Sequence, residues 1–285
     1  MKPAPKRPAF GSTLRRIGQP TEPFRDVYAF LLRTRWPIVV GLAAAAFLFV
    51  NLLFATLYWI APGSIANTQG GFLGAFYFSV QTFGAIGYGF MYSEGLWGNS
   101  IVVLESFVSL LFIAVLTGIV FAKFARPRAM VLFSKNALIE KRDGVRTLTF
   151  RVANERGNDV VEAAIRVAFM ATHTSPEGKV LRRFHDLPLA RSESPLFVLS
   201  WQVFHPITED SPLYGLTVDQ MIEDDMRLIV TLTGFDGTFS QTIHARHMYW
   251  SDDLIDGHKF VDVIELNPDR SVTMDFRKFH GHEPE

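Results

Sequence analysis

The stretch Ala85-Ile86-Gly87-Tyr88-Gly89 lies inside a run from Trp36 to Ser93 that contains no Asp, Glu, Lys, Arg or His. Its two glycines lack a Cβ atom and readily take backbone conformations with positive φ, which turn successive carbonyl groups toward the same side. Carbonyl oxygens that face a common axis from several chains can replace the water shell of an ion. Irregular backbone persists within a membrane only where it is buried in protein or lines a water-filled path. The stretch therefore predicts an ion path lined by backbone, in preference to a chance turn.

Two apolar segments of membrane-spanning length flank this stretch. Residues 37–60 and 100–122 each suit a hydrocarbon core of about 30 Å at about 1.5 Å per residue. Between them, residues 71–82 are apolar but too short to span, which is typical of a re-entrant helix that leads directly into residues 85–89. The sequence thus predicts a transmembrane pore domain over residues 36–128.

The N-terminal region divides into two parts. Residues 1–22 are rich in proline, glycine and basic residues and predict a mobile tail without a signal peptide. In residues 23–35 the apolar residues recur at helical spacing. This segment is either the solvated start of the next helix or a separate amphipathic helix that lies along the membrane surface. Pro37 breaks the helix ladder and so favours the separate helix.

Charge and composition limit the possible functions. The formal net charge is zero, which gives no general attraction for nucleic acid, and the absence of cysteine excludes disulfides and cysteine-bound metals. Basic residues flank both ends of the apolar region, and such residues are retained on the cytoplasmic side. We therefore expect both termini in the cytoplasm.

The texture changes after Arg128. Short runs alternate apolar and polar residues and are separated by turn signals such as Asp143-Gly144. Residues 129–285 therefore predict an all-β sandwich. The predicted strands include Thr147–Ala153, Phe197–Phe204, Arg227–Thr233, Phe239–Ala245, Phe260–Leu266 and Val272–Phe276. One short helix is expected at Val218–Asp224, because Thr217 and Gln220 have capping-box spacing.

This order of elements resembles the inwardly rectifying potassium channels, especially the prokaryotic KirBac branch. The motifs that carry the resemblance are Phe78-Ser-Val-Gln-Thr82, Phe121-Ala-Lys-Phe-Ala-Arg-Pro127, Arg183-Phe-His-Asp186, Asp210-Ser-Pro-Leu-Tyr214 and His244-Ala-Arg-His247. The resemblance implies a multi-pass homotetramer in a bacterial inner membrane, a cytoplasmic immunoglobulin-like domain and gating linked to anionic phospholipids. It also implies that potassium ions bind only at the carbonyls of residues 85–89, which we call the filter segment, and that no cofactor is needed.

The filter segment departs from the family pattern at its first residue. The family usually has Thr where this chain has Ala85, so one oxygen-bearing side chain of the innermost ion site is lost. The resemblance further implies that Ile113 and Thr117 line a cavity and that Phe121 is a gate at which four rings exclude water. Phe121 could instead face lipid, and periodicity does not decide because the helix is apolar all round.

Two sets of charged residues have more than one interpretation. Glu105 either braces the re-entrant helix, for example through Gln81, or lies near the outer headgroups. A basic cluster at the inner membrane face either sets topology alone or also binds anionic phospholipid headgroups. Its members are Arg33, Arg35, Lys123, Arg126 and Arg128.

No catalytic site or protein-bound metal site is expected. His244 and His247 lie three residues apart on a predicted strand and so face opposite sides, which argues against a shared metal. The sequence therefore predicts a passive potassium channel, not an enzyme. The alternative is a poorly selective or non-conducting channel-like sensor that binds a ligand at its cytoplasmic domain. The missing hydroxyl at Ala85 is the reason for retaining this alternative.

Overall fold

The computed structural model describes residues 27–68, 70–125 and 129–285. The chain forms two compact units, one that ends at Arg126 and one that contains Pro127–Glu285. The predicted mobile tail, residues 1–22, lies outside the described residues.

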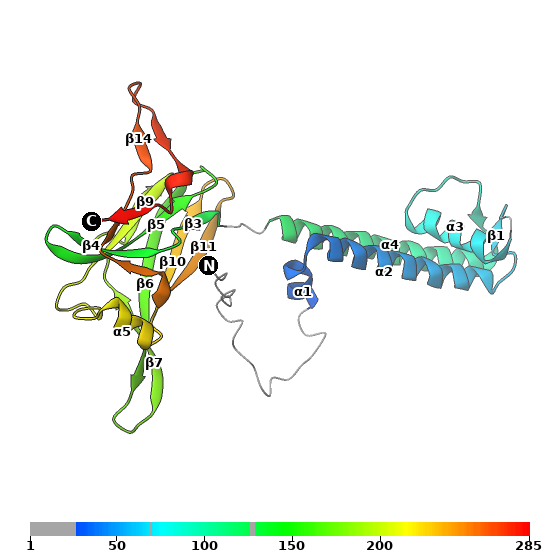
Figure 1. Ribbon diagram of the computed structural model, residues 1–285. Coiled ribbons are helices and arrows are strands. Elements are labelled where there is room, and N and C mark those ends of the chain that lie inside the picture. Colours follow the sequence, from blue (N-terminus) through cyan, green and yellow to red (C-terminus); the bar gives the residue numbers. More distant parts are fainter. Residues whose placement is uncertain (1–26, 69, 126–128) are drawn as a thin grey trace, which may run out of the picture. The chain divides into compact units, whose positions relative to one another are not determined.

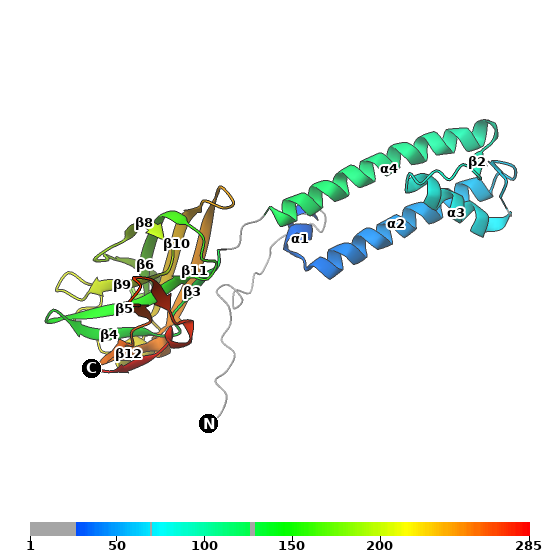
Figure 2. The same cartoon turned by 90° about the horizontal axis from the view of Figure 1, so that it is seen from above.

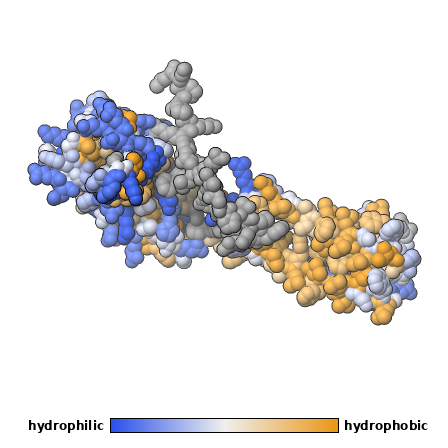
Figure 3. Space-filling model, turned by 90° about the horizontal axis from the view of Figure 1, so that it is seen from below, coloured by the Kyte–Doolittle hydropathy of each residue, from blue (hydrophilic) through white to orange (hydrophobic). Residues whose placement is uncertain are grey.

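The first unit is helical (Figure 1). Its helices are α1 (Val27–Arg33), α2 (Trp36–Trp59), α3 (Gly71–Phe83) and α4 (Gly95–Phe124). Arg35 is extended, with φ −66° and ψ 147°, and a proline stands at the start of α2, so the chain breaks between α1 and α2. Helices α2 and α4 are long and apolar enough to cross a membrane. Figure 3 shows the apolar surface that they leave exposed.

Helix α4 begins at Gly95, five residues before the start predicted at Ser100. The additional first turn includes polar Asn99, and both Asn99 and Ser100 are hydrogen-bonded within or beside the helix. Ser100 Oγ donates to Leu96 O at 2.7 Å, and Ser93 Oγ donates to Asn99 Oδ1 at 2.6 Å. Gly98 lets this turn approach the α2–α3 connection closely, because a Cβ there would lie 2.3 Å from Ser64 O.

Helix α3 lies against α2 and α4 (Figure 2). The three helices share a buried apolar cluster, which consists of Phe54, Ala55, Tyr58, Ile65, Ala75, Phe78 and Ile101. A two-stranded ribbon of β1 (Ile65–Ala66) and β2 (Tyr92–Ser93) joins the segments before and after α3. The ribbon therefore ties together the two ends of the segment that contains α3, and this segment lies on one side of the α2–α4 pair.

The second unit contains two five-stranded sheets. One has the order β11-β10-β6-β7, with β8 also paired to β6; the other has the order β12-β4-β5-β3, with β9 also paired to β5. The first consists of β6 (Val160–Thr174), β7 (Val180–Leu187), β8 (Glu193–Phe197), β10 (Arg227–Asp236) and β11 (Gln241–Trp250). The second consists of β3 (Val131–Phe133), β4 (Ala137–Arg142), β5 (Val145–Asn154), β9 (Ser200–Pro206) and β12 (Leu254–Asp256).

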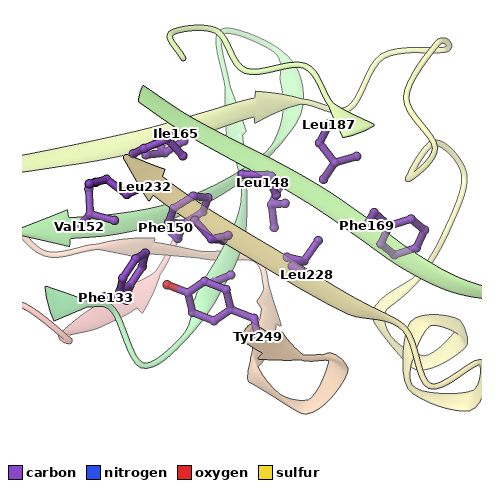
Figure 4. Packing of buried hydrophobic residues seen from close by; sticks show 14 of the residues in the cluster. Phe133, Leu148, Phe150, Val152, Ile165, Phe169, Leu187, Leu228, Leu232 and Tyr249 are labelled. Carbon is purple, nitrogen blue, oxygen red and sulfur yellow. The ribbon is translucent and has the colours of Figure 1, made fainter. Parts of the chain in front are cut away.

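The two sheets share one hydrophobic core. On β10 every second residue from Leu228 to Leu232 is buried, as strand geometry requires for a sheet with one face on a core. Figure 4 shows Leu228 and Leu232 in this core with Phe150 of β5 and Phe169 of β6. Strand β5 is buried on both faces, because C-terminal segments cover its outer side; there Arg151 Nη1 donates to Val261 O at 2.6 Å.

Several predicted strand boundaries differ from the structure. Predicted strand Phe197–Phe204 is divided, because β8 ends at Phe197 in one sheet and β9 begins at Ser200 in the other. Predicted strand Phe260–Leu266 is divided in the same way between β13 (His258–Phe260) and β14 (Ile264–Leu266). Alternation alone does not show where a chain changes sheet.

The remaining elements lie near the C-terminus and on the surface. Strand β13 pairs with β16 (His282–Pro284), and β14 pairs with β15 (Val272–Met274). Helix α5 (Val218–Glu223) carries the predicted capping box, in which Thr217 Oγ1 accepts from Gln220 N at 3.3 Å and Gln220 Oε1 accepts from Thr217 N at 2.9 Å. Two short 3₁₀ turns cover Ser251–Asp253 and Phe276–Lys278.

Candidate functional site

The filter segment follows directly from the C-terminal end of α3. Ala85 N donates to Thr82 O at 3.1 Å and Ile86 N donates to Gln81 O at 2.9 Å, so the last turn of the helix holds the first two residues. Beyond them, Asn67 Nδ2 donates to Phe90 O at 3.0 Å. The segment is thus anchored at both ends.

The backbone of the filter segment alternates in the sign of φ. Ala85, Gly87 and Gly89 have φ values of 52°, 60° and 80°, whereas the residues between them are not left-handed. Glycine accepts this conformation readily, but Ala85 carries a Cβ there. Tyr88 is 75% exposed and Ile86 is 49% exposed within one chain. The segment therefore presents its backbone and apolar side chains outside the core of its own subunit.

Glu105 lies in the interior of the helical unit. Its side chain is completely buried. Tyr58 Oη donates to Glu105 Oε2 at 2.7 Å, and Ser79 Oγ lies 2.5 Å from Glu105 Oε1. The acid therefore contacts the re-entrant candidate α3, but through Ser79 and not through Gln81. Sequence reasoning missed Tyr58, Ser79 and Asn51; the polar residues within apolar helices were the available signal.

The inner half of α4 presents two different faces. Phe112, Leu116 and Ile119 line an apolar groove shared with α1 and α2. Ile113, Thr117 and Phe121 succeed one another at intervals of four residues and are all exposed, Phe121 by 73%. Residues four apart lie on one side of a helix. The three predicted cavity and gate residues therefore share a face that does not pack within this subunit.

Lys123 is engaged by the first helix. Its Nζ donates to Leu31 O at 3.1 Å, to Leu32 O at 3.2 Å and to Thr34 O. These are carbonyls at the C-terminal end of α1, which lack partners within the helix and favour a cation. The rings of Trp36 and Phe124 lie beside this contact in a tilted arrangement, with centroids 4.7 Å apart. Lys123 thus joins α1 to α4 two residues beyond Phe121.

The other predicted lipid-binding residues are only partly described. Arg33 and Arg35 are exposed at the end of α1 and in the break that follows it. Arg126 and Arg128 lie outside the described residues.

His244 and His247 of β11 have different surroundings. His244 is exposed. His247 stacks on Phe133 with ring centroids 5.0 Å apart, and burial lowers its pKa. Among the described residues, no cluster of three or more His, Asp or Glu side chains could hold a metal ion.

Two family models match this chain and together cover most of it. Residues 13–127 match the inward rectifier potassium channel transmembrane domain, and residues 131–284 match the inward rectifier potassium channel C-terminal domain. The boundary between them coincides with the boundary between the two structural units.

Comparison with individual proteins gives the same family. The chain is 39% identical to inward rectifier potassium channel Kirbac3.1 of Paramagnetospirillum magnetotacticum, over 98% of this chain and 97% of that protein. It is 30% identical to human inward rectifier potassium channel 4, over 90% of this chain and 66% of that protein. It is 29% identical to the Gallus gallus ATP-sensitive inward rectifier potassium channel 12, over 92% of this chain and 66% of that protein. The chain thus spans about two thirds of these two vertebrate relatives.

Proposed function

This chain belongs to the inward rectifier potassium channel family, and from that premise we propose that four copies form one pore that conducts potassium passively across a bacterial inner membrane. In this proposal α3 is the re-entrant pore helix and α2 and α4 are the spanning helices. The β unit is an immunoglobulin-like cytoplasmic domain, and both termini are cytoplasmic. The family is one of ion channels and not of enzymes.

The observation that carries the proposal is the filter segment. It is apolar, free of charge and exposed within one chain, and its φ values alternate in sign. Alternation of this kind brings carbonyls to one side of the backbone. The C-terminal end of α3, where helix dipoles are negative, leads into it and favours a cation. Four copies around an axis would cover the exposed side chains and line the path with oxygen.

The test is cation flux into liposomes that contain the purified protein. We expect potassium to enter and sodium to enter much less. Gly87→Ala, which places a Cβ on backbone with φ of 60°, strains the centre of the filter segment and should lower potassium entry. Equal permeability to potassium and sodium would refute a potassium channel.

A second candidate function is tested by the same assay. Ala85 supplies no hydroxyl to the innermost ion site, which favours a poorly selective or non-conducting sensor that binds its ligand at the β unit. Unselective flux, or none from a correctly assembled tetramer, would support this alternative.

We further propose that anionic phospholipids regulate gating through the basic cluster of Arg33, Arg35, Lys123, Arg126 and Arg128. Each cation near an anionic surface contributes about 1 kcal/mol of attraction. Neutralising Arg126 and Arg128 together should reduce the response of flux to added anionic lipid, and high salt should weaken the response in the same direction. Arg183→Gln with Arg270→Gln, both exposed on the β unit, is the control. An unchanged lipid response in a properly assembled double variant would leave the cluster with a topological role only.

A further inference from the structure

A buried polar chain crosses the apolar interior of the helical unit. It runs from Tyr58 of α2 through Glu105 of α4 and Ser79 of α3 to Asn51 of α2. None of the four side chains is more than 1% exposed. Because polar groups are expensive to bury unless they are hydrogen-bonded, this chain must be satisfied internally.

Counting protons along the chain shows that one is missing. Asn51 Nδ2 donates to Phe47 O at 2.8 Å, which directs Asn51 Oδ1 toward Ser79 Oγ at 3.1 Å. The amide oxygen can only accept, so the hydroxyl proton of Ser79 is required there. The same Ser79 Oγ lies 2.5 Å from Glu105 Oε1, and one hydroxyl proton cannot serve two acceptors. Tyr58 already gives its proton to Oε2.

A proton on Glu105 Oε1 completes every hydrogen bond. The carboxyl then donates to Ser79 Oγ, Ser79 donates to Asn51 Oδ1, and Tyr58 donates to Oε2. Charge balance supports the same assignment. Between Trp36 and Ala125 the sequence contains one basic residue, Lys123, which lies about 27 Å further along α4 at about 1.5 Å per residue. An ionised Glu105 would have no counter-charge nearby among residues 36–125.

We propose that Glu105 is a protonated carboxylic acid that positions α3, and through α3 the filter segment. The predicted effect on ion selection rests on the proposed channel function, whereas the protonation of Glu105 does not. Glu105 is a positioning residue that acts through Ser79.

The structure supplies the path from Ser79 to the filter segment. Ser79 lies one helical turn before Phe83, the last residue of α3, and Ser109 Oγ donates to Phe83 O at 2.5 Å. Gln81 and Thr82 of the same turn accept from the backbone N–H groups of Ile86 and Ala85. A shift of α3 relative to α2 and α4 would therefore displace the first carbonyls of the filter segment.

The protonation state has a direct test. Infrared spectra of the membrane-reconstituted protein at neutral pH should contain the C=O stretching band of a neutral carboxylic acid that disappears in Glu105→Gln. Difference spectra isolate this group from the other acidic residues. If no such band is lost, the assignment of the proton is wrong.

The positioning role is tested by the same substitution. A glutamine amide can accept from Tyr58 and donate to Ser79, as the protonated acid does, so the potassium-to-sodium permeability ratio should stay within about twofold of the parent value. Ser79→Ala and Tyr58→Phe should each lower that ratio by on the order of tenfold, because each leaves a buried polar partner unsatisfied. Thr56→Ala, which removes an exposed hydroxyl bond within α2, is the matched control.

The outcomes separate this inference from the proposed function. If Glu105→Gln lowered the potassium-to-sodium permeability ratio as much as Ser79→Ala does, a protonated Glu105 that bridges Tyr58 and Ser79 would be ruled out. Unaltered selectivity in both Ser79→Ala and Tyr58→Phe would overturn the positioning role. If the parent protein carried no potassium, the channel proposal would fail, while the infrared band and the thermal stabilities of the same variants would still decide the bridge.

Discussion

At residue 85 a substitution that adds a hydroxyl would supply an oxygen ligand, but the backbone conformation there is unfavourable for a β-branched side chain. The resemblance to the family places a threonine here, whose hydroxyl would supply an oxygen ligand. In this chain the backbone at Ala85 has φ of 52°. A β-branched residue is a poor occupant of that conformation, and its strain is of the order of 1 kcal/mol or more.

Ala85→Ser should therefore raise the preference for potassium over sodium more cleanly than Ala85→Thr. Serine adds the hydroxyl without a second branch at Cβ. We expect both variants to increase the permeability ratio in liposome flux, and Ala85→Thr also to lower the thermal stability of the tetramer. Ala85→Val, which is branched but has no hydroxyl, is the control. A gain in selectivity with valine equal to that with threonine would exclude the hydroxyl as the cause.

Glu105 shows how far single residues can be interpreted from sequence. An acid inside an apolar helix predicts an internal partner, and the structure provides one. The partner is Ser79 and not Gln81, because residues two apart on a helix point about 200° away from each other. The sequence contains no information on the rotation of α3 about its own axis, which decides between them.

At the scale of elements, local sequence patterns predicted where the helices lie but not which residues they contact. The charge-free run located α2 and α3 to within one residue at each end, and the spacing of Thr217 and Gln220 located α5. The partners of Lys123 lie about ninety residues earlier in the chain and could not be inferred from any local pattern. The ammonium group that caps α1 is thus the same one that we propose contributes to lipid binding.

Lys123→Met should loosen α1 from α4. Methionine keeps an apolar stem but removes the donors to the last carbonyls of α1. We expect amide hydrogen exchange in residues 27–34 to accelerate by on the order of tenfold, the equilibrium effect of losing a charge-assisted hydrogen bond. Lys123→Arg should restore much of the protection. Lys141→Met, an exposed lysine of β4, controls for loss of charge. Unchanged exchange in Lys123→Met would mean that the contact does not hold α1.

Phe121→Ala should raise basal potassium flux. Phe121 shares an exposed face of α4 with Ile113 and Thr117, and no side chain is present at nearby Gly118. Four alanines at a constriction would admit water where four aromatic rings exclude it. Phe107→Ala, an equally apolar and exposed change in the outer half of α4, should have little effect. If accessibility labelling in a closed tetramer placed residue 121 against lipid, the gate assignment would be wrong.

At the scale of the whole molecule, the described residues form two cores that share no residue. One lies among α2, α3 and α4, and the other lies between the two sheets. The two units divide in the sequence between Arg126 and Pro127, close to the change in sequence pattern after Arg128. Separate cores favour separate unfolding transitions, so conditions that act on one unit need not act on the other.

Acid should lower the stability of the β unit through His205. This side chain is 2% exposed, and its ring nitrogens lie 2.6 Å from Pro188 O and 2.7 Å from Ser211 Oγ. Burial lowers its pKa, so as pH falls the unfolded chain takes up the proton first, at about pH 6.5. The free energy of unfolding therefore decreases below that pH and is retained above it. Burial acts in the same direction on His247, so His205→Gln should remove part of the slope.

The measurement is the midpoint of denaturant unfolding of the β unit in the full-length protein between pH 5 and 8, followed by tryptophan fluorescence of Trp201 and Trp250. His173→Gln, at an exposed position of β6, should leave the slope unchanged. An identical pH dependence in His205→Gln and the parent would rule out this residue as the cause.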